Sequence, residues 1–223
     1  MAMGLPEQKT LVKIAADEAY LEGMLELPSH VTGLILFAHG SGSSRLSPRN
    51  NYVASVLRDA GLGTLLLDLL TPGEDRHYET RFDISLLTRR LELALTWIRQ
   101  LPSPLATLPV GLFGASTGAA SALRLAALMP GIVGAVVSRG GRADMAGADI
   151  LRQVRAPTLL LVGGLDDVVI ELNKAAYEQM QCERQLHIVP DATHLFEEAG
   201  ALENVAQLAT EWFLKHLAPA KKS

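Results

Sequence analysis

Several features are scarce or absent in this 223-residue sequence, and each absence excludes a class of protein. A single cysteine, Cys182, excludes a disulfide scaffold and a zinc site built on paired cysteines. With 20 Lys and Arg against 24 Asp and Glu, the chain has a formal net charge of −4 and no basic excess to neutralise nucleic-acid phosphates. Aromatic residues make up only 5%, so stacking platforms for bases are poorly supplied. No apolar run reaches the roughly 18 residues that a membrane-spanning helix requires.

The remaining composition is that of an ordinary globular chain, with 48% hydrophobic and 20% charged residues. Residues 1–10 include Glu7 and Lys9 and lack the apolar centre of a secretory signal. A lone cysteine needs no oxidising compartment. We therefore expect a cytoplasmic protein without a nucleic-acid or membrane partner. The composition does not decide whether the protein forms a homo-oligomer.

Short apolar runs alternate with amphipathic stretches along most of the chain. Residues 10–15 and 19–27 predict an N-terminal antiparallel hairpin. Six further strands are expected, most of them continuous apolar runs typical of parallel strands buried on both faces: residues 33–38, 63–67, 108–113, 132–137, 157–162 and 184–189. Helices are expected between and after them: residues 52–60, 84–100, 117–128, 145–154, 169–180 and 199–217.

This alternation predicts an α/β fold, with a mostly parallel central sheet, helices on both faces and the hairpin extending one edge. The elements use almost the whole length, so we expect one domain over residues 1–223 without a large cap. Ligands of such sheets bind at the carboxyl ends of the strands. The loop 71–81 is the largest candidate for a partial cover of that edge.

A Gly-x-Ser-x-Gly segment follows the run 108–113, with Ser116 at its centre between Gly114 and Gly118. This is the place of a nucleophile elbow, where a serine sits on a strained strand-to-helix turn. The residues two positions away must lack a Cβ, because neighbouring backbone passes close by. The alternative interpretation is a glycine-rich turn whose serine only caps the helix.

A serine hydroxyl needs a base, and the base needs an orienting carboxylate. Asp166 and His194 each follow a predicted strand, so they fall on loops at the same edge as Ser116. The order serine, acid, histidine is that of α/β-hydrolases. We therefore predict a triad of Ser116, His194 and Asp166, with Asp167 as a candidate helix cap.

The glycine-rich loop 39–44 follows the first parallel strand. Its backbone N–H groups can form half of an oxyanion hole, with the N–H of Thr117 as the other half. We expect the N–H of Ser41 to be this donor, with the N–H of Gly42 as the alternative. We expect His39 to brace the loop rather than to transfer protons. The dinucleotide fingerprint is incomplete here, and neither a phosphate loop nor a metal-ligand spacing occurs, so we expect no cofactor.

Four arginines follow strands at the same edge: Arg45, Arg49, Arg139 and Arg142. Their guanidinium groups could hold a carboxylate or phosphate of the substrate through paired N–H donors. The alternative is a network of salt bridges that fixes the loops to nearby acids, among them Glu74, Asp75, Asp144 and Glu197.

From about residue 33 to residue 217, the chain resembles the α/β-hydrolase superfamily and, within it, the dienelactone-hydrolase-like group. The resemblance rests on four segments: His-Gly-Ser-Gly at 39–42, Gly-Ala-Ser-Thr-Gly at 114–118, Gly-Gly-Leu-Asp-Asp-Val-Val at 163–169 and Ala-Thr-His-Leu-Phe at 192–196. The family pattern G-x-D-x-x-V implies Asp166 as the acid, whereas a shifted register would choose Asp167. Dienelactone hydrolases proper carry cysteine at the nucleophile position, where this chain has Ser116.

These features predict a serine hydrolase that cleaves a small ester, thioester or lactone through an acyl-enzyme, without metal or organic cofactor. The scarcity of aromatic residues and the lack of a cap favour a small or extended acyl substrate. The alternative is a non-catalytic protein that binds a small molecule on a hydrolase scaffold. The two differ in whether an activated ester is turned over.

Overall fold

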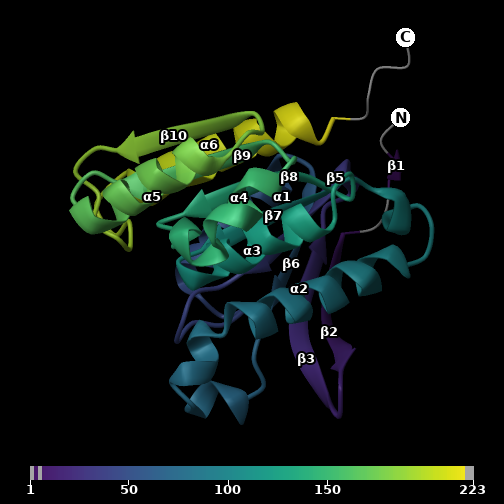
Figure 1. Ribbon diagram of the computed structural model, residues 1–223. Coiled ribbons are helices and arrows are strands. Elements are labelled where there is room, and N and C mark those ends of the chain that lie inside the picture. The colour runs from purple at the N-terminus through teal and green to yellow at the C-terminus, as the bar shows by residue number, and fades with distance from the viewer. Residues whose placement is uncertain (1–2, 5–6, 219–223) are drawn as a thin grey trace.

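A computed structural model describes residues 3–4 and 7–218, and its centre is an eight-stranded sheet (Figure 1). The strand order is β10-β9-β8-β7-β5-β6-β3-β2. The strands from β10 to β6 run parallel, and β3 and β2 join antiparallel at the β6 edge. Their bounds are β2 (Gln8–Ala16), β3 (Ala19–Leu27), β5 (Gly33–Ala38), β6 (Leu62–Leu67), β7 (Val110–Ala115), β8 (Val133–Arg139), β9 (Thr158–Gly163) and β10 (Arg184–Val189). A separate short pair joins β1 (Met3–Gly4) to β4 (His30–Val31).

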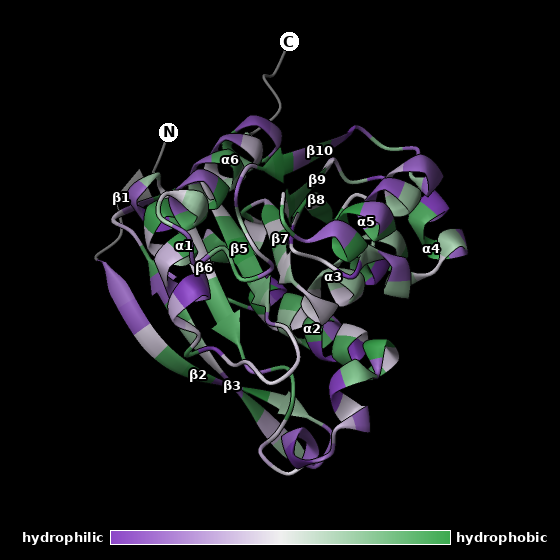
Figure 2. Ribbon diagram, turned by 90° about the vertical axis from the view of Figure 1, so that its left-hand side faces the viewer, coloured by the Kyte–Doolittle hydropathy of each residue, from purple (hydrophilic) through white to green (hydrophobic). Residues whose placement is uncertain are grey.

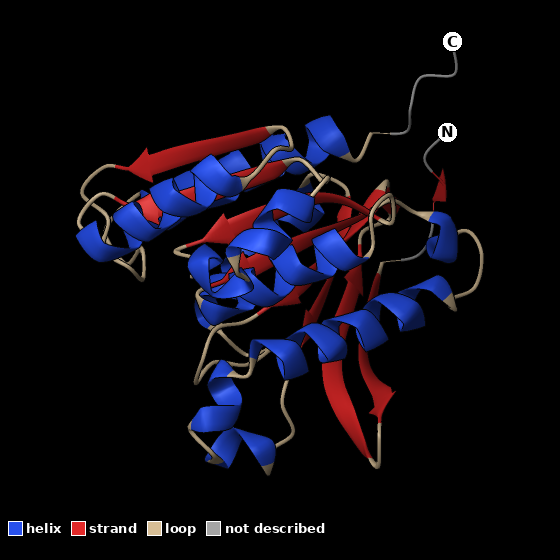
Figure 3. Cartoon of the chain, in the orientation of Figure 1, coloured by secondary structure: helices blue, strands red, loops and turns tan. Residues whose placement is uncertain are grey.

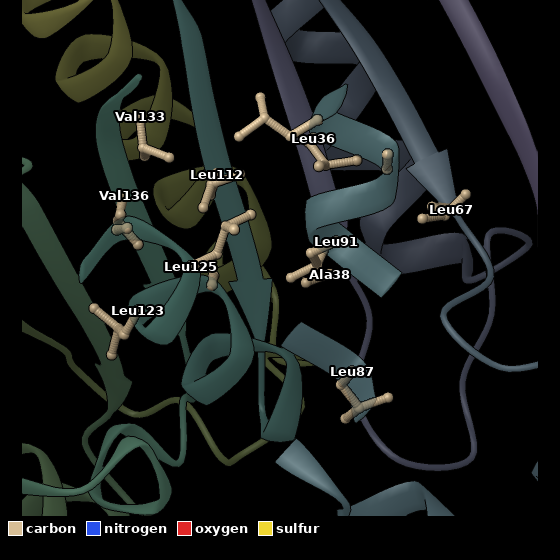
Figure 4. Close-up of a cluster of buried hydrophobic side chains, with 14 of the residues drawn as sticks. Leu36, Ala38, Leu67, Leu87, Leu91, Leu112, Leu123, Leu125, Val133 and Val136 are labelled. Carbon is tan, nitrogen blue, oxygen red and sulfur yellow. The ribbon is translucent and has the colours of Figure 1, made fainter. Parts of the chain in front are cut away.

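Helices cover both faces of the sheet (Figure 3). One face carries α1 (Pro48–Asp59) and α6 (Ala201–His216), whose apolar side chains pack on the sheet around Phe113 and Phe37. The other face carries α2 (Ile84–Arg99), α3 (Thr117–Leu128), α4 (Ala148–Gln153) and α5 (Asp167–Gln179). Figure 4 shows the core on this second side, where Leu36 and Leu112 of the sheet lie with Leu91 and Leu125 of the helices. The α/β fold expected from the sequence is therefore confirmed.

Burial along the strands explains why the sequence patterns differ. Every residue of β5, β6, β7 and β9 is buried, because these strands lie between two helical layers. Strand β2 instead alternates between exposed and buried residues over its second half, as an edge strand with one covered face does. The hydropathy colouring in Figure 2 follows this division, with the inner strands the most uniformly apolar.

Two predicted helices differ from the structure, one in where it begins and one in its continuity, and local backbone chemistry explains both. Helix α1 begins at Pro48 rather than at residue 52, because the Ser47 hydroxyl accepts the N–H of Asn50 and proline suits the first turn. The helix predicted over 145–154 is two pieces, a 3₁₀ turn (Ala143–Ala146) followed by α4. Gly147 separates them at a φ of 90°, which no helix accommodates.

The loop 71–81 has structure of its own, since it contains the 3₁₀ turns η1 (Glu74–Arg76) and η2 (Glu79–Phe82). In the part of the chain that the structure describes, no helix is long and apolar enough to cross a membrane. Nor do three His, Cys, Asp or Glu side chains gather there in a way that could hold a metal ion.

Candidate active site

Ser116 occupies the sharp turn between β7 and α3, with a φ of 50° and a ψ of −121°. A positive φ is strained for a residue with a side chain, and such strain persists only where the surroundings enforce it. The Ser116 side chain makes no capping hydrogen bond to α3. Ser116 thus occupies the N-cap position without a side-chain capping bond, and its backbone geometry is the one expected of a nucleophile elbow.

The two glycines of the motif are required by close backbone approaches. A Cβ on Gly114 would lie 2.4 Å from the Cα of Ala119, and a Cβ on Gly118 would lie 2.2 Å from the carbonyl oxygen of Ala38. Neither contact can relax, because the opposing atoms belong to backbone inside the core. The expectation that both positions exclude a Cβ is confirmed.

The end of β8 and the loop after it bond Ser116 on both sides. The Ser116 N–H donates to the carbonyl of Arg139 at 3.2 Å, and the N–H of Arg142 donates to the carbonyl of Ser116 at 3.0 Å. Gly140, between them, packs against His194, since a Cβ there would lie 3.5 Å from the His194 Cε1. The same short loop thus contacts the candidate nucleophile and the candidate base.

Asn173 of α5 fixes that loop, and sequence reasoning missed it. Its Nδ2 donates to the carbonyl of Gly141 at 2.8 Å and to that of Val169 at 2.8 Å, and its side chain is fully buried. The available signal was a polar residue four positions after Val169 and three before Ala176, on the buried face of the predicted helix. Asn173 links the helix that follows the candidate acid to the loop around Ser116.

The candidate acid and base are in direct contact, since the Asp166 Oδ2 lies 2.6 Å from the His194 Nδ1. Asp166 takes the N-cap position of α5 but makes no capping bond, so its carboxylate is free for the histidine. Asp167 is instead the first residue of the helix and is exposed. An imidazole that donates from Nδ1 keeps the lone pair of Nε2 available to accept a proton.

The loop around Gly140 lies next to both Ser116 and His194. Among the residues described here, however, no hydrogen bond joins the serine hydroxyl to the imidazole. Bonds of this kind are often long without substrate and tighten when it binds. The His194 loop itself is held by the Thr193 N–H, which donates to the Glu198 Oε2 at 3.0 Å. The Thr193 side chain, and after it backbone N–H groups that include this one, lower the pKa of the Glu198 carboxyl.

His39 braces the glycine-rich loop, as the sequence predicts. Its Nδ1 donates to the carbonyl of Gly40 at 2.9 Å, while its Nε2 accepts the N–H of Leu69 at 3.0 Å. Both bonds are made by the neutral ring, and burial lowers the pKa of His39. Gly40 then passes directly beside the nucleophile, because a Cβ there would lie 2.9 Å from the Ser116 Cβ.

Ser41 and Thr117, whose N–H groups were expected to form the oxyanion hole, line one small cavity beside this loop. Thr117 is the first residue of α3, so its N–H has no acceptor within the helix. The positive end of the helix dipole adds to the attraction for negative charge at this point. The arrangement can therefore stabilise an oxyanion formed at Ser116.

Three of the four edge arginines form salt bridges. Arg142 donates through two nitrogens to the Asp144 carboxylate at 2.9 and 2.7 Å, which raises the pKa of Arg142. Arg49 pairs with Glu197 at 2.6 Å. Arg45 pairs with Glu22 at 2.7 Å and also with Asp68, two acids that the sequence did not suggest as partners. These contacts match the salt-bridge alternative for the three side chains.

Arg139 is different, because it is buried and contacts no carboxylate among the described residues. Its Nη2 lies 3.4 Å from the Asn50 Oδ1, and its guanidinium lies 6.0 Å from the centre of the Phe196 ring. Burial, together with the nearby charge of Arg49, lowers the pKa of Arg139 to about 10.

Comparison with known proteins agrees with this geometry. The chain is 53% identical to the crystal structure of a dienelactone hydrolase from Anabaena variabilis, with a TM-score of 0.90 over 96% of this chain and 100% of that one. Est1E from Butyrivibrio proteoclasticus has the same fold, with a TM-score of 0.80 at 17% identity over 94% of this chain and 99% of that one. No family model matches the sequence.

Two curated relatives from Mycobacterium tuberculosis strains are 54% identical over 206 residues and are provisionally named phosphoribosyl transferases. The match covers 92% of this chain but 46% of each relative, so the chain spans about half the length of the curated relatives it matches. The close structural relative, by contrast, is matched over its full length. The chain belongs to the α/β-hydrolase superfamily and, within it, to the dienelactone-hydrolase-like group.

Proposed function

We propose that this protein is a serine hydrolase that cleaves a small ester, thioester or lactone through an acyl-enzyme. The observation that carries the proposal is the Asp166–His194 hydrogen bond of 2.6 Å beside a serine on a strained elbow. A structural histidine on a surface loop needs no carboxylate bonded to its Nδ1, and a structural serine needs no positive φ. The combination is what nucleophilic catalysis by serine requires.

In the proposed reaction, the Ser116 Oγ attacks the acyl carbonyl while the His194 Nε2 takes the hydroxyl proton. Asp166 holds the ring in the required tautomer and stabilises the imidazolium. The N–H groups of Thr117 and Ser41 hold the oxyanion of the tetrahedral intermediate. His194 then gives its proton to the leaving oxygen or sulfur, and the acyl-enzyme remains.

Water then hydrolyses the acyl-enzyme, with water as the nucleophile and Ser116 as the leaving group. His194 removes a proton from water as it attacks the acyl-enzyme carbonyl, and a second oxyanion forms in the same hole. Collapse of this intermediate breaks the bond to the Ser116 Oγ, which recovers its proton from His194. The products are the free acid and the alcohol or thiol, or a hydroxy acid from a lactone.

The relatives support hydrolysis more directly than transfer of a phosphoribosyl group. The structure matched over its whole length is named a dienelactone hydrolase. The transferase name belongs to proteins about twice as long as this chain, of which this chain matches 46%. The Asp166–His194 hydrogen bond, and the packing of Gly140 near His194 next to the loop that bonds Ser116, support acyl chemistry instead.

A fluorophosphonate probe and an activated ester test the proposal together. Wild type should be labelled and should hydrolyse p-nitrophenyl acetate, whereas Ser116→Ala should lose labelling and at least about 10³-fold of kcat. Ser55→Ala removes a serine hydroxyl on α1 that donates to the carbonyl of Tyr52, its one hydrogen bond in the described part of the chain, so it serves as the matched control. Labelling that persists in Ser116→Ala would exclude Ser116 as the nucleophile.

The non-catalytic binding protein remains the second candidate. It predicts that wild type binds a small ester or acid saturably, that no activated ester is turned over, and that His194→Ala binds equally well. The Asp166 carboxylate hydrogen-bonded to His194 argues against it, because a binding protein gains nothing from an oriented base.

A further inference from the structure

Two arginines are buried in the part of the chain that the structure describes, Arg90 and Arg139, and their surroundings differ. Arg90 pairs with Glu74 at 2.8 Å and with Asp17 at 3.1 Å. The Nε and Nη1 of Arg139, by contrast, are buried without a hydrogen bond to any described residue, and its Nη2 makes one long contact of 3.4 Å to the Asn50 Oδ1. A buried cation without a carboxylate is costly to the folded state, so its donors point to a ligand.

The Arg139 side chain is directed at the first turn of α1. Asn50, which its Nη2 contacts, is the third residue of that helix, and Arg49 is the second. Burial first, and then the nearby charge of Arg49, lower the pKa of Arg139, so the two guanidinium groups lie close together. The Arg49 Nε is also buried and has no hydrogen-bond partner among the described residues.

The end of α1 adds positive potential at the same place. Its first turn contains no acidic residue, although acids are favoured at that position by the helix dipole. Two guanidinium groups and the positive end of a helix thus converge, with three guanidinium nitrogens that lack an acceptor in the described part of the chain. Like charges brought together in this way call for an anion between them.

One carboxylate reaches this place from outside. Glu197 pairs with the Arg49 Nη1 at 2.6 Å, and its side chain is 62% exposed, compared with 32% for that of Arg49. The Arg139 residue is only 8% exposed, so it lies innermost and Glu197 lies at the solvent side. Exposed salt bridges contribute little to stability, so an incoming anion can displace Glu197 from Arg49 at small cost and reach Arg139 behind it.

The same place adjoins the candidate active site. The carbonyl of Arg139 accepts the N–H of Ser116 at 3.2 Å. The Phe196 ring lies 6.0 Å from the Arg139 guanidinium, and Phe196 follows His194 by two positions. Phe196 also has a φ of 56°, a strained value for a residue with a side chain, which persists only where the surroundings enforce it. The arginine pair therefore lies between the strand end that bonds Ser116 and the loop that carries His194.

A phosphate group suits these donors better than a carboxylate does. Its two negative charges balance both arginines, whereas the single charge of Glu197 is used by Arg49 and leaves Arg139 without a partner. Its oxygens point in three directions, so it can accept from guanidinium groups on two different elements, β8 and α1. Helix N-termini are also a common place for phosphate in proteins.

We propose that Arg139 and Arg49, at the N-terminus of α1, form a binding site for a phosphate group that displaces Glu197 from Arg49. The phosphate is either the free ion or a part of the substrate. Only the second of these sources rests on the proposed hydrolase function, whose substrate would then be a phosphorylated ester or thioester.

Isothermal titration calorimetry with inorganic phosphate tests the site directly. Wild type should bind phosphate, and Arg139→Met should bind it at least about tenfold more weakly, because charge-assisted hydrogen bonds are lost. Arg142→Met is the matched control, since it removes the same charge from the same loop, but from a guanidinium already bonded to Asp144. Its affinity for phosphate should stay within about threefold of wild type.

Glu197→Gln tests the displacement. Without the competing carboxylate, phosphate should bind about two- to fivefold more tightly, as expected for the loss of an exposed salt bridge. Glu171→Gln, which breaks the exposed pair with Lys174, should bind phosphate as wild type does. Weaker binding in Glu197→Gln would overturn the exchange of one anion for the other.

Stability separates a ligand site from a structural role for Arg139. Arg139→Met should unfold in urea with a free energy equal to or above that of wild type, because the substitution removes a buried charge and keeps an apolar side chain of similar length. A variant that is clearly less stable and still binds phosphate with the wild-type affinity would assign Arg139 to the fold and overturn the proposal.

Two acetate esters distinguish the sources of the phosphate. 4-Acetoxyphenyl phosphate and phenyl acetate share the acetyl group and differ in the phosphate on the ring. A kcat/KM at least about tenfold higher for the phosphorylated ester, lost in Arg139→Met, would place the phosphate on the substrate. Equal values for the two esters, with inorganic phosphate still bound through Arg139, would identify the ligand as the free ion.

The proposal is overturned if wild type does not bind phosphate, if Arg139→Met binds it equally well, or if acetate binds as tightly as phosphate does. Calorimetry needs no turnover, and Ser116→Ala should bind phosphate as wild type does. Absence of Ser116-dependent hydrolysis for every ester would therefore refute the hydrolase function while the phosphate site remained.

Discussion

The carboxylate of Asp166 lies 2.6 Å from the His194 Nδ1, although the two residues follow different strands and are 28 positions apart. Asp166→Asn should therefore lower kcat by about 10³- to 10⁴-fold, because an amide that donates to Nδ1 selects the wrong tautomer of the ring. Steady-state kinetics on an activated ester measures the effect.

Asp167→Asn supplies the control, because Asp167 is the neighbouring acid and is exposed at the start of α5. It should change kcat by less than about threefold, as surface substitutions outside the site do. If the Asp167 variant lost activity and the Asp166 variant kept it, the shifted register of the family pattern would be the correct one.

The features that the sequence predicted well are those that local chemistry determines. Buried parallel strands are continuous apolar runs, and Ser116 is marked by two glycines that backbone contacts require. The order of Ser116, Asp166 and His194 along parallel strands then places all three at one edge. These inferences need no knowledge of which side chains finally touch.

The features that it did not predict depend on three-dimensional partners. Arg45 pairs with Asp68 and Glu22, which come from the end of β6 and from β3, and no spacing in the sequence relates them. Asn173 acts on Gly141, 32 residues away. The early start of α1 depends on one hydroxyl, that of Ser47, whereas apolar periodicity begins only further along the helix.

His39 makes stability depend on pH. Burial lowers the pKa of His39 below the ordinary 6.5. As the pH falls, the imidazole is therefore protonated in the unfolded chain before it is protonated in the folded protein. Its contribution to the free energy of unfolding is therefore complete above pH 6.5 and declines as the pH falls below it, by at most about 1.4 kcal/mol per pH unit. Urea unfolding at several values between pH 7.5 and pH 5 measures this decline.

His39→Gln should be less stable than wild type at pH 7.5 and should show a flatter dependence, since it has no ring to protonate. His77→Gln, at an exposed position in the loop 71–81, should leave the wild-type curve unchanged. A wild-type slope that survives in His39→Gln would assign the effect to other groups.

Asn173 should affect both stability and rate. Asn173→Ala leaves the carbonyl of Gly141 without its donor in a buried place, which costs about 1–3 kcal/mol of unfolding free energy. Because that loop holds Ser116, we also expect kcat to fall several-fold with little change in KM. Urea unfolding and steady-state kinetics at a temperature where the variant is fully folded separate the two effects.

Lys174→Ala is the control: Lys174 is an exposed neighbour whose one ion pair among the described residues is with Glu171, so the change should alter neither quantity appreciably. If Asn173→Ala lost stability but kept the wild-type kcat, Asn173 would have no part in positioning Ser116.

The arginines differ in what they can offer a charged substrate. Arg142 binds the Asp144 carboxylate through Nε and Nη2, so its charge is already paired, and Arg142→Ala should reduce kcat/KM for neutral and anionic esters by the same factor. Phenyl acetate and 4-acetoxybenzoate form a suitable pair, because they share the acetyl group and differ in a carboxylate on the leaving group of the second.

Arg139 contacts no carboxylate in the described part of the chain, so any selective loss for the anionic ester should appear in Arg139→Met. A selective loss in Arg142→Ala would mean that the substrate displaces Asp144 and that this salt bridge belongs to the binding site.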